Sequence, residues 1–486
     1  MLNYIKFVFL IICLSSVSSA QPLFTGFLNH INSLSDPAAK QASIDSFMIV
    51  ARSQGIPLIE QNYATFIYNG LATSLTLAGD FNSWSSNSES FSKISGTNFW
   101  YKTKSFELNA RLDYKFVRNA TSWILDPENP HTCNGGFGPN SELSMPAYIQ
   151  PWEINLNPTI PHGTVETRTL YSTNTLSTYN IRIYLPPGYN PGQPTLYPAA
   201  YFQDGFEYID LASATNVIDN LIDSLKIRKI IGVFVRPNNR NEEYAFTKRT
   251  PYRLFFVNEL VPFIDSLYKT IPQPAARLVL GDSYGGNISA LISYNHPEVF
   301  GNCGLHSAAF QPNNYEAYSL IVSGPKKNIR FASVWGTYES LYSNMRNFRD
   351  ALLSKGYDLK WKELPEGHSW GLWRASVDDM LEFFFPPFPA AIEENLHSPS
   401  EFSLAQNFPN PFNPSTIINF FIPKKSFVSL KVLNITGTII AELINSTMNS
   451  GNHSVIFHAD ALPSGVYFYS LTVGNSAQTR KMILIK

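Results

Sequence analysis

Cysteine is scarce in this chain. Its 486 residues include 3 cysteines, against 25 tyrosines and 35 phenylalanines. A small fold stapled by disulfides is therefore excluded, because a chain of this length buries a core without covalent bridges. No group of Cys and His residues has the spacing of a metal site, and we expect no metal. For Cys133 and Cys303, a single disulfide and two buried thiols both remain open.

Excess charge of either sign is also absent. Lys and Arg number 36, Asp and Glu number 37, and the formal net charge is −1, with no basic block. Binding to nucleic acid depends on clustered positive charge that neutralises phosphates. Nucleic acid is therefore excluded as an expected partner.

The apolar run at the N-terminus is too short to cross a membrane as a helix. It covers Phe7 to Ile12, after Lys6 and before the small residues Ser18-Ser19-Ala20. This order is typical of a secretory signal peptide, which we predict for residues 1–20. A lipid anchor on Cys13 is disfavoured, because Ile12 stands where a lipoprotein signal has a small residue.

Two different patterns follow the signal peptide. Residues 21–56 have the apolar spacing of helices, with Asp36-Pro37 as a helix start. Residues 57–151 contain short alternating runs separated by Gly, Asn, Asp and Ser, the pattern of an all-β sandwich. We predict a helical segment followed by a β domain.

The rest of the chain predicts two more folded units. In residues 152–390, strand-like runs alternate with helix-like stretches, which indicates a mostly parallel sheet covered by helices on both faces. The ligand site of such a sheet lies at the C-terminal ends of its strands. Residues 391–402 read as a polar linker, and the alternating strands of residues 403–486 predict a second β-sandwich.

A nucleophile motif lies in the central unit. The sequence Gly281-Asp282-Ser283-Tyr284-Gly285-Gly286 follows an apolar strand and precedes a helix-like stretch. That context is typical of a nucleophile elbow, in which glycines give room to a strained turn that lifts the Ser oxygen above the sheet. We predict Ser283 as a catalytic nucleophile, and the alternative is a tight turn with a bystander serine.

The hydroxyl of Ser283 needs a base to take its proton, and His368 is the predicted base. His368 comes just beyond the last predicted strand, where a loop can bring an imidazole over the strand ends. His296 is expected at the far end of the helix after the elbow and His306 beside the next strand, where packing explains them equally well.

An acid must orient this imidazole and stabilise its charged form. Glu339 follows a predicted strand over residues 329–334 and is the predicted acid, and the alternative is a solvated loop carboxylate. Asp350 falls on a predicted helix, and Asp358 precedes its strand and so lies at the wrong edge. The order Ser, acid, His is that of the α/β-hydrolases.

The predicted oxyanion hole consists of backbone N–H groups, which stabilise the negative charge that develops on the substrate oxygen. Tyr284 supplies one N–H, and Phe206 or Gly205, in the loop after a predicted strand over residues 197–202, supplies the other.

Other side chains have two explanations each. Arg240 either reaches a substrate oxygen or forms an ion pair with Glu242 or Glu243. Trp370 and Trp373, which flank the His, either wall the substrate pocket or pack in the core. Sugar stacking and core packing are the two explanations for three tryptophans of the first β domain, namely Trp84, Trp100 and Trp123.

Six stretches of the mature chain carry a family resemblance, namely Pro57 to Glu60, Leu77 to Trp84, Leu125 to Pro130, Leu185 to Tyr189, Gly281 to Gly286 and Gly367 to Trp370. Through them the chain resembles the enterochelin esterase-like branch of the esterase D superfamily, close to feruloyl and acetylxylan esterases. The resemblance implies an α/β-hydrolase with Ser283 and His368 in catalytic roles and an acid at Glu339. It also implies that residues 57–151 form an immunoglobulin-like early-set domain, related to carbohydrate-binding modules.

The final unit resembles the type A sorting domain of type IX secretion. The matching stretches are Leu404 to Pro414, Leu462 to Tyr469 and Lys481 to Lys486. This resemblance implies export by way of the signal peptide, the type IX secretion machinery as a partner, and a final place outside the cell or on its outer surface.

Together these features predict a secreted serine esterase that hydrolyses carboxylic esters through an acyl-serine intermediate and needs no cofactor. The expected substrates are acetyl or feruloyl esters of polysaccharide, and a siderophore esterase of the enterochelin type is the alternative. A hypothesis of another class is a surface glycan-binding protein with an inactive hydrolase domain. The intact Ser283, His368 and elbow glycines disfavour that hypothesis.

Overall fold

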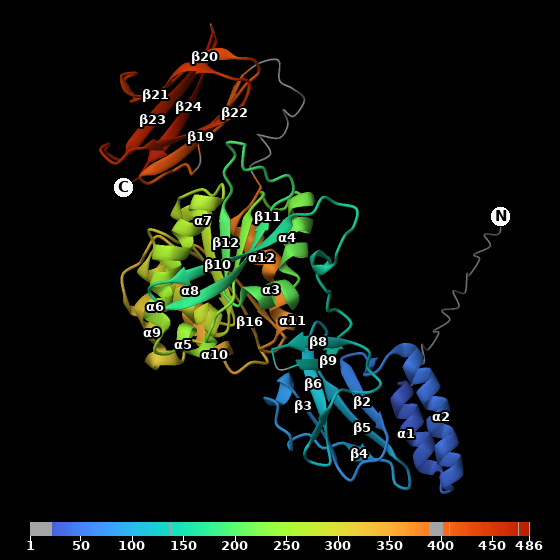
Figure 1. Ribbon diagram of the computed structural model, residues 1–486. Coiled ribbons are helices and arrows are strands. Elements are labelled where there is room, and N and C mark those ends of the chain that lie inside the picture. Colours follow the sequence, from blue (N-terminus) through green and yellow to red (C-terminus); the bar gives the residue numbers. More distant parts are fainter. Residues whose placement is uncertain (1–21, 137, 388–401, 408, 475, 486) are drawn as a thin grey trace, which may run out of the picture. The chain divides into compact units, whose positions relative to one another are not determined.

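The computed structural model describes residues 22–136, 138–387, 402–407, 409–474 and 476–485 (Figure 1). It divides into two compact units, residues 1–386 and 387–486. The predicted signal peptide and nearly all of the predicted linker lie outside the described residues. None of the helices in the described ranges combines the length and the apolar character that a membrane span requires.

The first unit begins with two helices, α1 (Leu23–Ser33) and α2 (Pro37–Gln54). Asp36 caps α2, because its carboxylate accepts a hydrogen bond of 2.9 Å from the N–H of Ala39. The buried faces of both helices pack together and onto the domain that follows. Phe27 stacks on Phe47 at 4.0 Å between ring centroids, and both rings meet the edge or face of Phe99 in that domain.

A β-sandwich of two antiparallel sheets follows the helices. One sheet has the strand order β1-β2-β5-β4, and the other has the order β3-β6-β9-β8 with β7 paired to β6. The bounds are β1 (Leu58–Glu60), β2 (Tyr63–Asn69), β3 (Leu75–Gly79), η1 (Asp80–Asn82), β4 (Ser92–Lys93), β5 (Phe99–Ser105), β6 (Arg111–Arg118), β7 (Ser122–Ile124), β8 (Thr132–Gly135) and β9 (Gly138–Ser144). Phe66, Leu77 and Phe116 belong to the buried core of the sandwich. Its immunoglobulin-like character stays a prediction.

The central domain is built on an eight-stranded sheet with the order β10-β11-β13-β12-β14-β15-β16-β17. Its strands are β10 (Thr164–Ser172), β11 (Ser177–Leu185), β12 (Ala199–Phe202), β13 (Ile231–Val235), β14 (Arg277–Asp282), β15 (Asn302–His306), β16 (Arg330–Gly336) and β17 (Leu359–Leu364). β10 and β11 run antiparallel to their neighbours, and the six strands from β12 to β17 are parallel. A parallel strand with both faces covered needs a continuous apolar run, and all five residues of β13 are buried.

Helices cover both faces of this sheet (Figure 1). The helices of one face are α5 (Arg240–Tyr244), α6 (Arg249–Phe255), η3 (Phe256–Leu260), α7 (Val261–Leu267), α8 (Tyr284–Asn295), α9 (Pro312–Ser323) and α10 (Tyr342–Ser354). Those of the other face are α3 (Gly205–Asp210), α4 (Ala214–Asp223), α11 (Trp370–Arg374) and α12 (Val377–Phe384). The short helices η2 (Trp152–Ile154) and η4 (Pro274–Ala276) lie in the connections. The predicted mostly parallel sheet with two helical layers is therefore present.

The second unit is a β-sandwich with a core of its own. Its sheets have the strand orders β18-β19-β22 and β21-β20-β23-β24. The bounds are β18 (Ser403–Leu404), β19 (Ser415–Ile422), β20 (Ser426–Leu433), β21 (Ile439–Met448), β22 (Gly451–His458), β23 (Gly465–Val473) and β24 (Ser476–Leu484). Alternate residues of β19 are buried, as the alternating sequence predicts.

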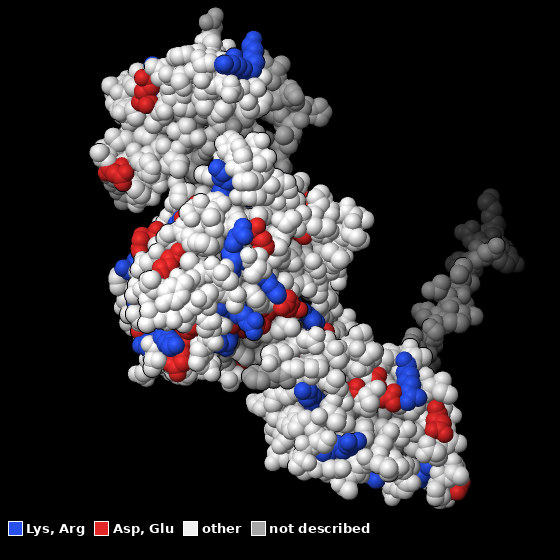
Figure 2. Space-filling view, viewed as in Figure 1, with Lys and Arg blue, Asp and Glu red and all other residues white. Residues whose placement is uncertain are grey.

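The two cysteines of the described chain are free and buried. Cys133 lies in β8 and Cys303 in β15, and they belong to different hydrophobic cores. Of the two explanations that the sequence leaves open, the structure has two buried thiols. On the face of the molecule shown in Figure 2, basic and acidic side chains are interspersed, in line with the net charge of −1.

Candidate active site

The turn after β14 holds Ser283 in a strained conformation. Its φ is 51° and its ψ is −118°, a region that costs free energy for a residue with a side chain. Two backbone hydrogen bonds fix the turn: the Ser283 N–H donates to the carbonyl of His306 at 2.8 Å, and the Ser283 carbonyl accepts from Ala309 N–H at 2.9 Å. Ser283 is half-buried at the C-terminal end of its strand, in the geometry of a nucleophile elbow.

The three elbow glycines are sterically required. A Cβ on Gly281 would lie 2.5 Å from the backbone of Gly285, and a Cβ on Gly286 would lie 2.9 Å from the Cβ of Ala308. A Cβ on Gly285 would lie 3.0 Å from the Asp204 carboxylate. These close approaches allow α8 to start directly beneath Ser283.

We predict that Gly281→Ala destabilises the protein by about 1–3 kcal/mol, because the added methyl group overpacks a rigid backbone contact. Urea unfolding followed by circular dichroism measures the change. Gly26→Ala in α1 is the matched control, because nothing lies within 4 Å of its added Cβ. Its expected effect is a stabilisation of about 0.5–1 kcal/mol. Equal stability of Gly281→Ala and the wild type would contradict the close packing of the elbow.

His368 and Glu339 form a hydrogen-bonded pair at the same edge of the sheet. Glu339 follows β16 and His368 follows β17, while Ser283 follows β14, and all these strands are parallel. The Nδ1 atom of His368 lies 2.5 Å from Oε2 of Glu339, and the other carboxylate oxygen accepts from the N–H of Gly336 at 2.9 Å. The Glu339 side chain is 1% exposed and that of His368 is 34% exposed. This arrangement leaves Nε2 of the imidazole as the nitrogen available to a reacting group.

Trp373 links the imidazole to the loop beside the elbow. Its ring lies edge-on to His368 at 5.1 Å between centroids, and its Nε1 donates to Oγ of Ser307 at 3.2 Å. Ser307 follows His306, which accepts the hydrogen bond of the Ser283 N–H. Among the described residues, no hydrogen bond joins Ser283 to His368. Such bonds often tighten only when substrate is bound.

Backbone N–H groups of two helix starts are available for an oxyanion. Tyr284 is the first residue of α8, and Gly205 and Phe206 are the first two residues of α3, directly after β12. The first turn of a helix has N–H groups without intrahelical acceptors, and these attract negative charge. A Cβ on Gly205 would lie 2.4 Å from backbone atoms of Phe234 and Val235 in β13. Close packing against this neighbouring strand therefore fixes the loop. The guanidinium of Arg182 lies 4.1 Å above the Phe206 ring.

Arg240 stabilises this loop by ion pairing. It donates two hydrogen bonds to Asp204, at 2.8 and 2.7 Å, and lies 3.4 Å from Asp282. Its partners are therefore not the predicted Glu242 or Glu243. The arginine bridges the residue before Gly205 to the residue before Ser283, while burial and the nearby Asp204 raise the pKa of Asp282 well above its usual range.

The remaining candidates from the sequence lie on helices or at the ends of helices and strands. Trp370 is 6% exposed and packs edge-on against Trp373 at 4.9 Å and against Tyr208 at 5.2 Å. His296 directly follows α8, Asp350 lies on α10, and Asp358 precedes β17. His306 is fully buried, its Nδ1 lies 2.7 Å from the Tyr208 hydroxyl, and burial lowers its pKa to about 3.

The tryptophans of the first sandwich do not form an exposed row. Trp100 is 7% exposed and belongs to the core. Trp84 is half-buried and donates to Asp80 at 3.1 Å, and Trp123 is 45% exposed and stacks on Trp84 at 6.5 Å. One exposed ring is therefore available at this surface.

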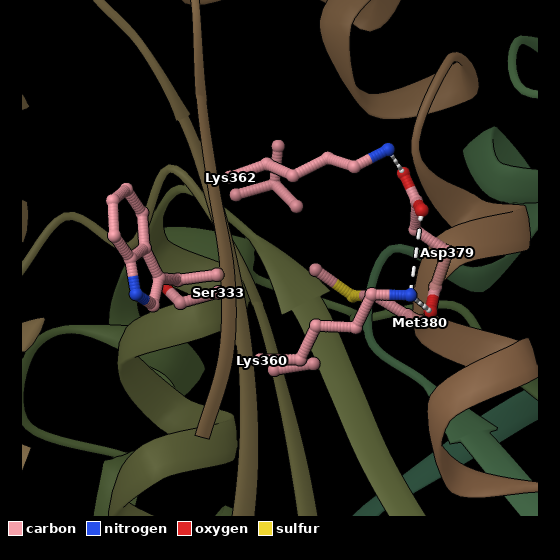
Figure 3. A pocket seen from close by; sticks show the side chains of 8 residues that line it. Ser333, Lys360, Lys362, Asp379 and Met380 are labelled. Atoms are coloured by element: carbon pink, nitrogen blue, oxygen red, sulfur yellow. Dashed lines mark hydrogen bonds and ion pairs between the residues drawn. The ribbon is translucent and has the colours of Figure 1, made fainter. Parts of the chain in front are cut away.

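A small cavity lies away from these candidates. It has a volume of about 10 Å³, room for about one water molecule, and lies between β16, β17 and α12 (Figure 3). Lys360 and Lys362 reach across it to Asp379. Ser283, Glu339 and His368 are not among its lining residues.

Two family models match the chain. Residues 172–384 match the model described as "Putative esterase", and these residues contain Ser283, Glu339 and His368. The central domain is therefore similar to this esterase family. Residues 406–486 match the "Secretion system C-terminal sorting domain", which supports secretion or delivery to the outer surface.

Curated relatives each match somewhat less than half of the chain. An uncharacterized protein of Bacillus subtilis, YjcH, is 25% identical over 235 residues, 46% of this chain and 97% of that protein. An endo-1,4-beta-xylanase/feruloyl esterase of Xylanibacter ruminicola is 28% identical over 223 residues, 42% of this chain and 30% of that protein.

Solved structures share the fold over a longer stretch, 66% of this chain. The ferric enterobactin esterase of Salmonella typhimurium has a TM-score of 0.58 at 17% identity, and the likeness covers 66% of this chain and 93% of that one. The enterobactin esterase of Shigella flexneri has a TM-score of 0.56 at 19% identity, over 66% and 92%. These likenesses show the fold alone.

Proposed function

We propose that this protein is a secreted esterase that hydrolyses carboxylic esters by nucleophilic catalysis from Ser283. The observation that carries the proposal is the pair of His368 and Glu339 at the strand-end edge where Ser283 occupies a strained turn. The pair orients the imidazole with Nε2 free, and the elbow presents the hydroxyl.

The mechanism follows from these positions. Ser283 Oγ attacks the ester carbonyl carbon while its proton passes to Nε2 of His368, and Glu339 stabilises the imidazolium. The N–H of Tyr284 and that of Gly205 or Phe206 stabilise the oxyanion. The intermediate collapses, the alcohol leaves with the proton from His368, and water then hydrolyses the acyl-serine by the same steps. Apart from the ester and water, this mechanism uses only side chains and backbone groups of the protein.

We propose acetyl or feruloyl esters of polysaccharide as the substrate class. The relative from Xylanibacter ruminicola is named an endo-1,4-beta-xylanase/feruloyl esterase, and it is 28% identical to this chain over 223 residues. The exposed Trp123 ring is available to stack on a sugar. The type IX secretion machinery would export the enzyme to where polysaccharide is found.

A specific observation favours a second candidate, an esterase acting on an anionic, siderophore-like ester. Arg182 and Arg236 lie 4.1 and 5.7 Å from the Phe206 ring, beside the proposed oxyanion hole. Cationic groups at this place would attract an anionic acyl group, although Arg182 also pairs with Asp210 at 3.0 Å.

Substrate screening of the mature chain separates these candidates. Rates on p-nitrophenyl acetate, methyl ferulate, acetylated xylan and enterobactin are measured beside labelling of Ser283 by a fluorophosphonate probe, located by mass spectrometry. We expect labelling at Ser283 and the highest kcat/KM on a saccharide or ferulate ester. A preference for enterobactin would support the second candidate. Absence of both labelling and hydrolysis would instead support a glycan-binding protein with an inactive hydrolase domain.

A further inference from the structure

The loop that carries His368 is attached to the N-terminal sandwich. Arg111, the first residue of β6, forms a parallel β-bridge with Glu366. The Arg111 N–H donates to the carbonyl of Pro365 at 3.2 Å. A strand of the first domain therefore continues the backbone pairing at the point where the chain leaves β17 for His368.

The Arg111 side chain reaches the other side of His368. Its guanidinium is 0% exposed and donates to Oγ of Ser369 at 3.0 Å. It also pairs with Asp113 and Glu142, each at 2.6 Å. Burial opposes the charge of Arg111, but the carboxylate of Asp113 and the other anionic neighbours outweigh it and raise the pKa of Arg111 well above its usual range. A buried ion cluster is costly to desolvate and is therefore weak evidence for stability alone.

Two glycines near His368 leave room for side chains of the sandwich. A Cβ on Gly367 would overlap the carboxyl of Asp80, and a Cβ on Gly371 would overlap the guanidinium of Arg111. Asp80 is itself fixed, because it accepts a 2.7 Å hydrogen bond from the N–H of Asp113. Gly367 and Gly371, before and after His368, thus pack directly against the first domain.

A second arginine completes the attachment. Arg374, at the end of α11, donates to Oε2 of Glu142 at 2.7 Å, the same oxygen that accepts from Arg111. Glu142 is therefore the common partner of an arginine in the sandwich and an arginine in the helix after His368.

We propose that Arg111 is a positioning residue for His368. By pairing with Glu366 on one side and binding Ser369 on the other, it fixes the loop so that the imidazole meets Glu339 and Ser283 together. The inference rests on the proposed serine-esterase mechanism. It makes the N-terminal sandwich part of the catalytic apparatus, beyond any role in binding sugar.

Three variants of the full mature chain test this role. Ser369→Ala removes only the acceptor on the loop, while Arg111→Met removes the guanidinium and Arg111→Lys retains the charge. The measurements are kcat and KM on p-nitrophenyl acetate, the labelling rate of Ser283 by a fluorophosphonate, and the midpoint of thermal unfolding. Arg52→Met is the matched control, because Arg52 is an exposed arginine of the N-terminal part whose side chain is 55% exposed and pairs with Glu128.

The expected result is a loss in kcat with KM nearly unchanged. Misplacement of a catalytic group by about 1 Å can cost about 100-fold in rate, so we expect about 10-fold for Ser369→Ala and about 100-fold for Arg111→Met. Arg111→Lys should recover part of the rate, and Arg52→Met should match the wild type. The labelling rate should fall in parallel with kcat.

Two other results would separate a failure of this inference from a failure of the proposed function. If Ser369→Ala keeps the wild-type kcat and labelling rate, the inference is overturned, whatever happens to the unfolding midpoint of the Arg111 variants. If the wild type itself neither labels at Ser283 nor hydrolyses the ester, the proposed function fails and the inference falls with it. Should Arg111→Met not fold, Ser369→Ala decides the question alone, because it leaves the ion cluster within the sandwich intact.

Discussion

Ser283→Ala is expected to lower the turnover of p-nitrophenyl acetate by about 10⁴-fold or more, as loss of other triad serines does. The alanine removes the hydroxyl of the elbow serine, while the strained backbone and its bonds to His306 and Ala309 stay in place. Because serine and histidine act as a unit, adding His368→Ala to Ser283→Ala should lower the rate little further.

The control for this experiment is a serine inside α8, the helix that follows the elbow. Ser293→Ala removes a fully buried hydroxyl that bonds to the carbonyl of Ala290 in α8, and its kcat should stay close to that of the wild type. Equal rates for Ser283→Ala and the wild type would refute Ser283 as the nucleophile. They would make the elbow a tight turn without catalytic function.

Glu339→Gln is expected to lower kcat by about 10³–10⁴-fold with KM little changed, since the equivalent change in a Ser-His-Asp triad costs about 10⁴-fold. Glutamine keeps the volume of the buried side chain, but its amide can present an N–H to Nδ1 of His368. The imidazole would then carry its proton on Nε2, the nitrogen that must accept the proton of Ser283. The pre-steady-state burst of p-nitrophenol measures the loss in the acylation step.

Glu363→Gln on β17 is the matched change of carboxylate to amide. Glu363 pairs with Arg346 at 2.6 Å and accepts from Trp335, away from the imidazole, so its kcat should be unchanged. A Glu339→Gln variant with wild-type kcat would indicate that His368 and Ser283 work as a pair without an acid. Glu339 would then serve only to hold the turn through Gly336.

The candidate site could be predicted from local sequence because its residues sit in short, self-contained patterns. An apolar strand, three glycines and a helix place Ser283 in an elbow, where a Cβ on Gly281 or Gly286 would lie within 3.0 Å of a neighbour and one on Gly285 would make a tight contact. His368 and Glu339 could be placed because each follows a strand directly, and in a parallel sheet all such ends share one edge.

The contacts that connect distant segments could not be predicted. Arg111 and Ser369 are 258 positions apart, and nothing in either stretch indicates the other. For Arg240 the sequence suggests only the nearby Glu242 and Glu243 as ion-pair partners, but folding brings Asp204 to it, 36 positions away. Pairing between distant residues depends on the assembled fold, which no single-sequence pattern contains.

Strand β10 also escaped prediction, for a different reason. It lies at the edge of the central sheet, and only Ser172 among its nine residues is buried. An edge strand with both faces mostly in water has neither a continuous apolar run nor a clear alternation. Its partner β11 could be predicted because Tyr179, Ile181 and Ile183 alternate into the core.

The separate core of the second unit has a practical consequence for protein engineering. Every buried apolar residue of that core lies between Leu404 and Leu484, so the segment contains within itself what it needs to pack. A recombinant fusion of residues 402–486 to the C-terminus of an unrelated carrier would keep this packing intact. Equally, a protease that cut ahead of Phe402 would take no side chain from the cores that support Ser283, and the released hydrolase would retain its whole interior.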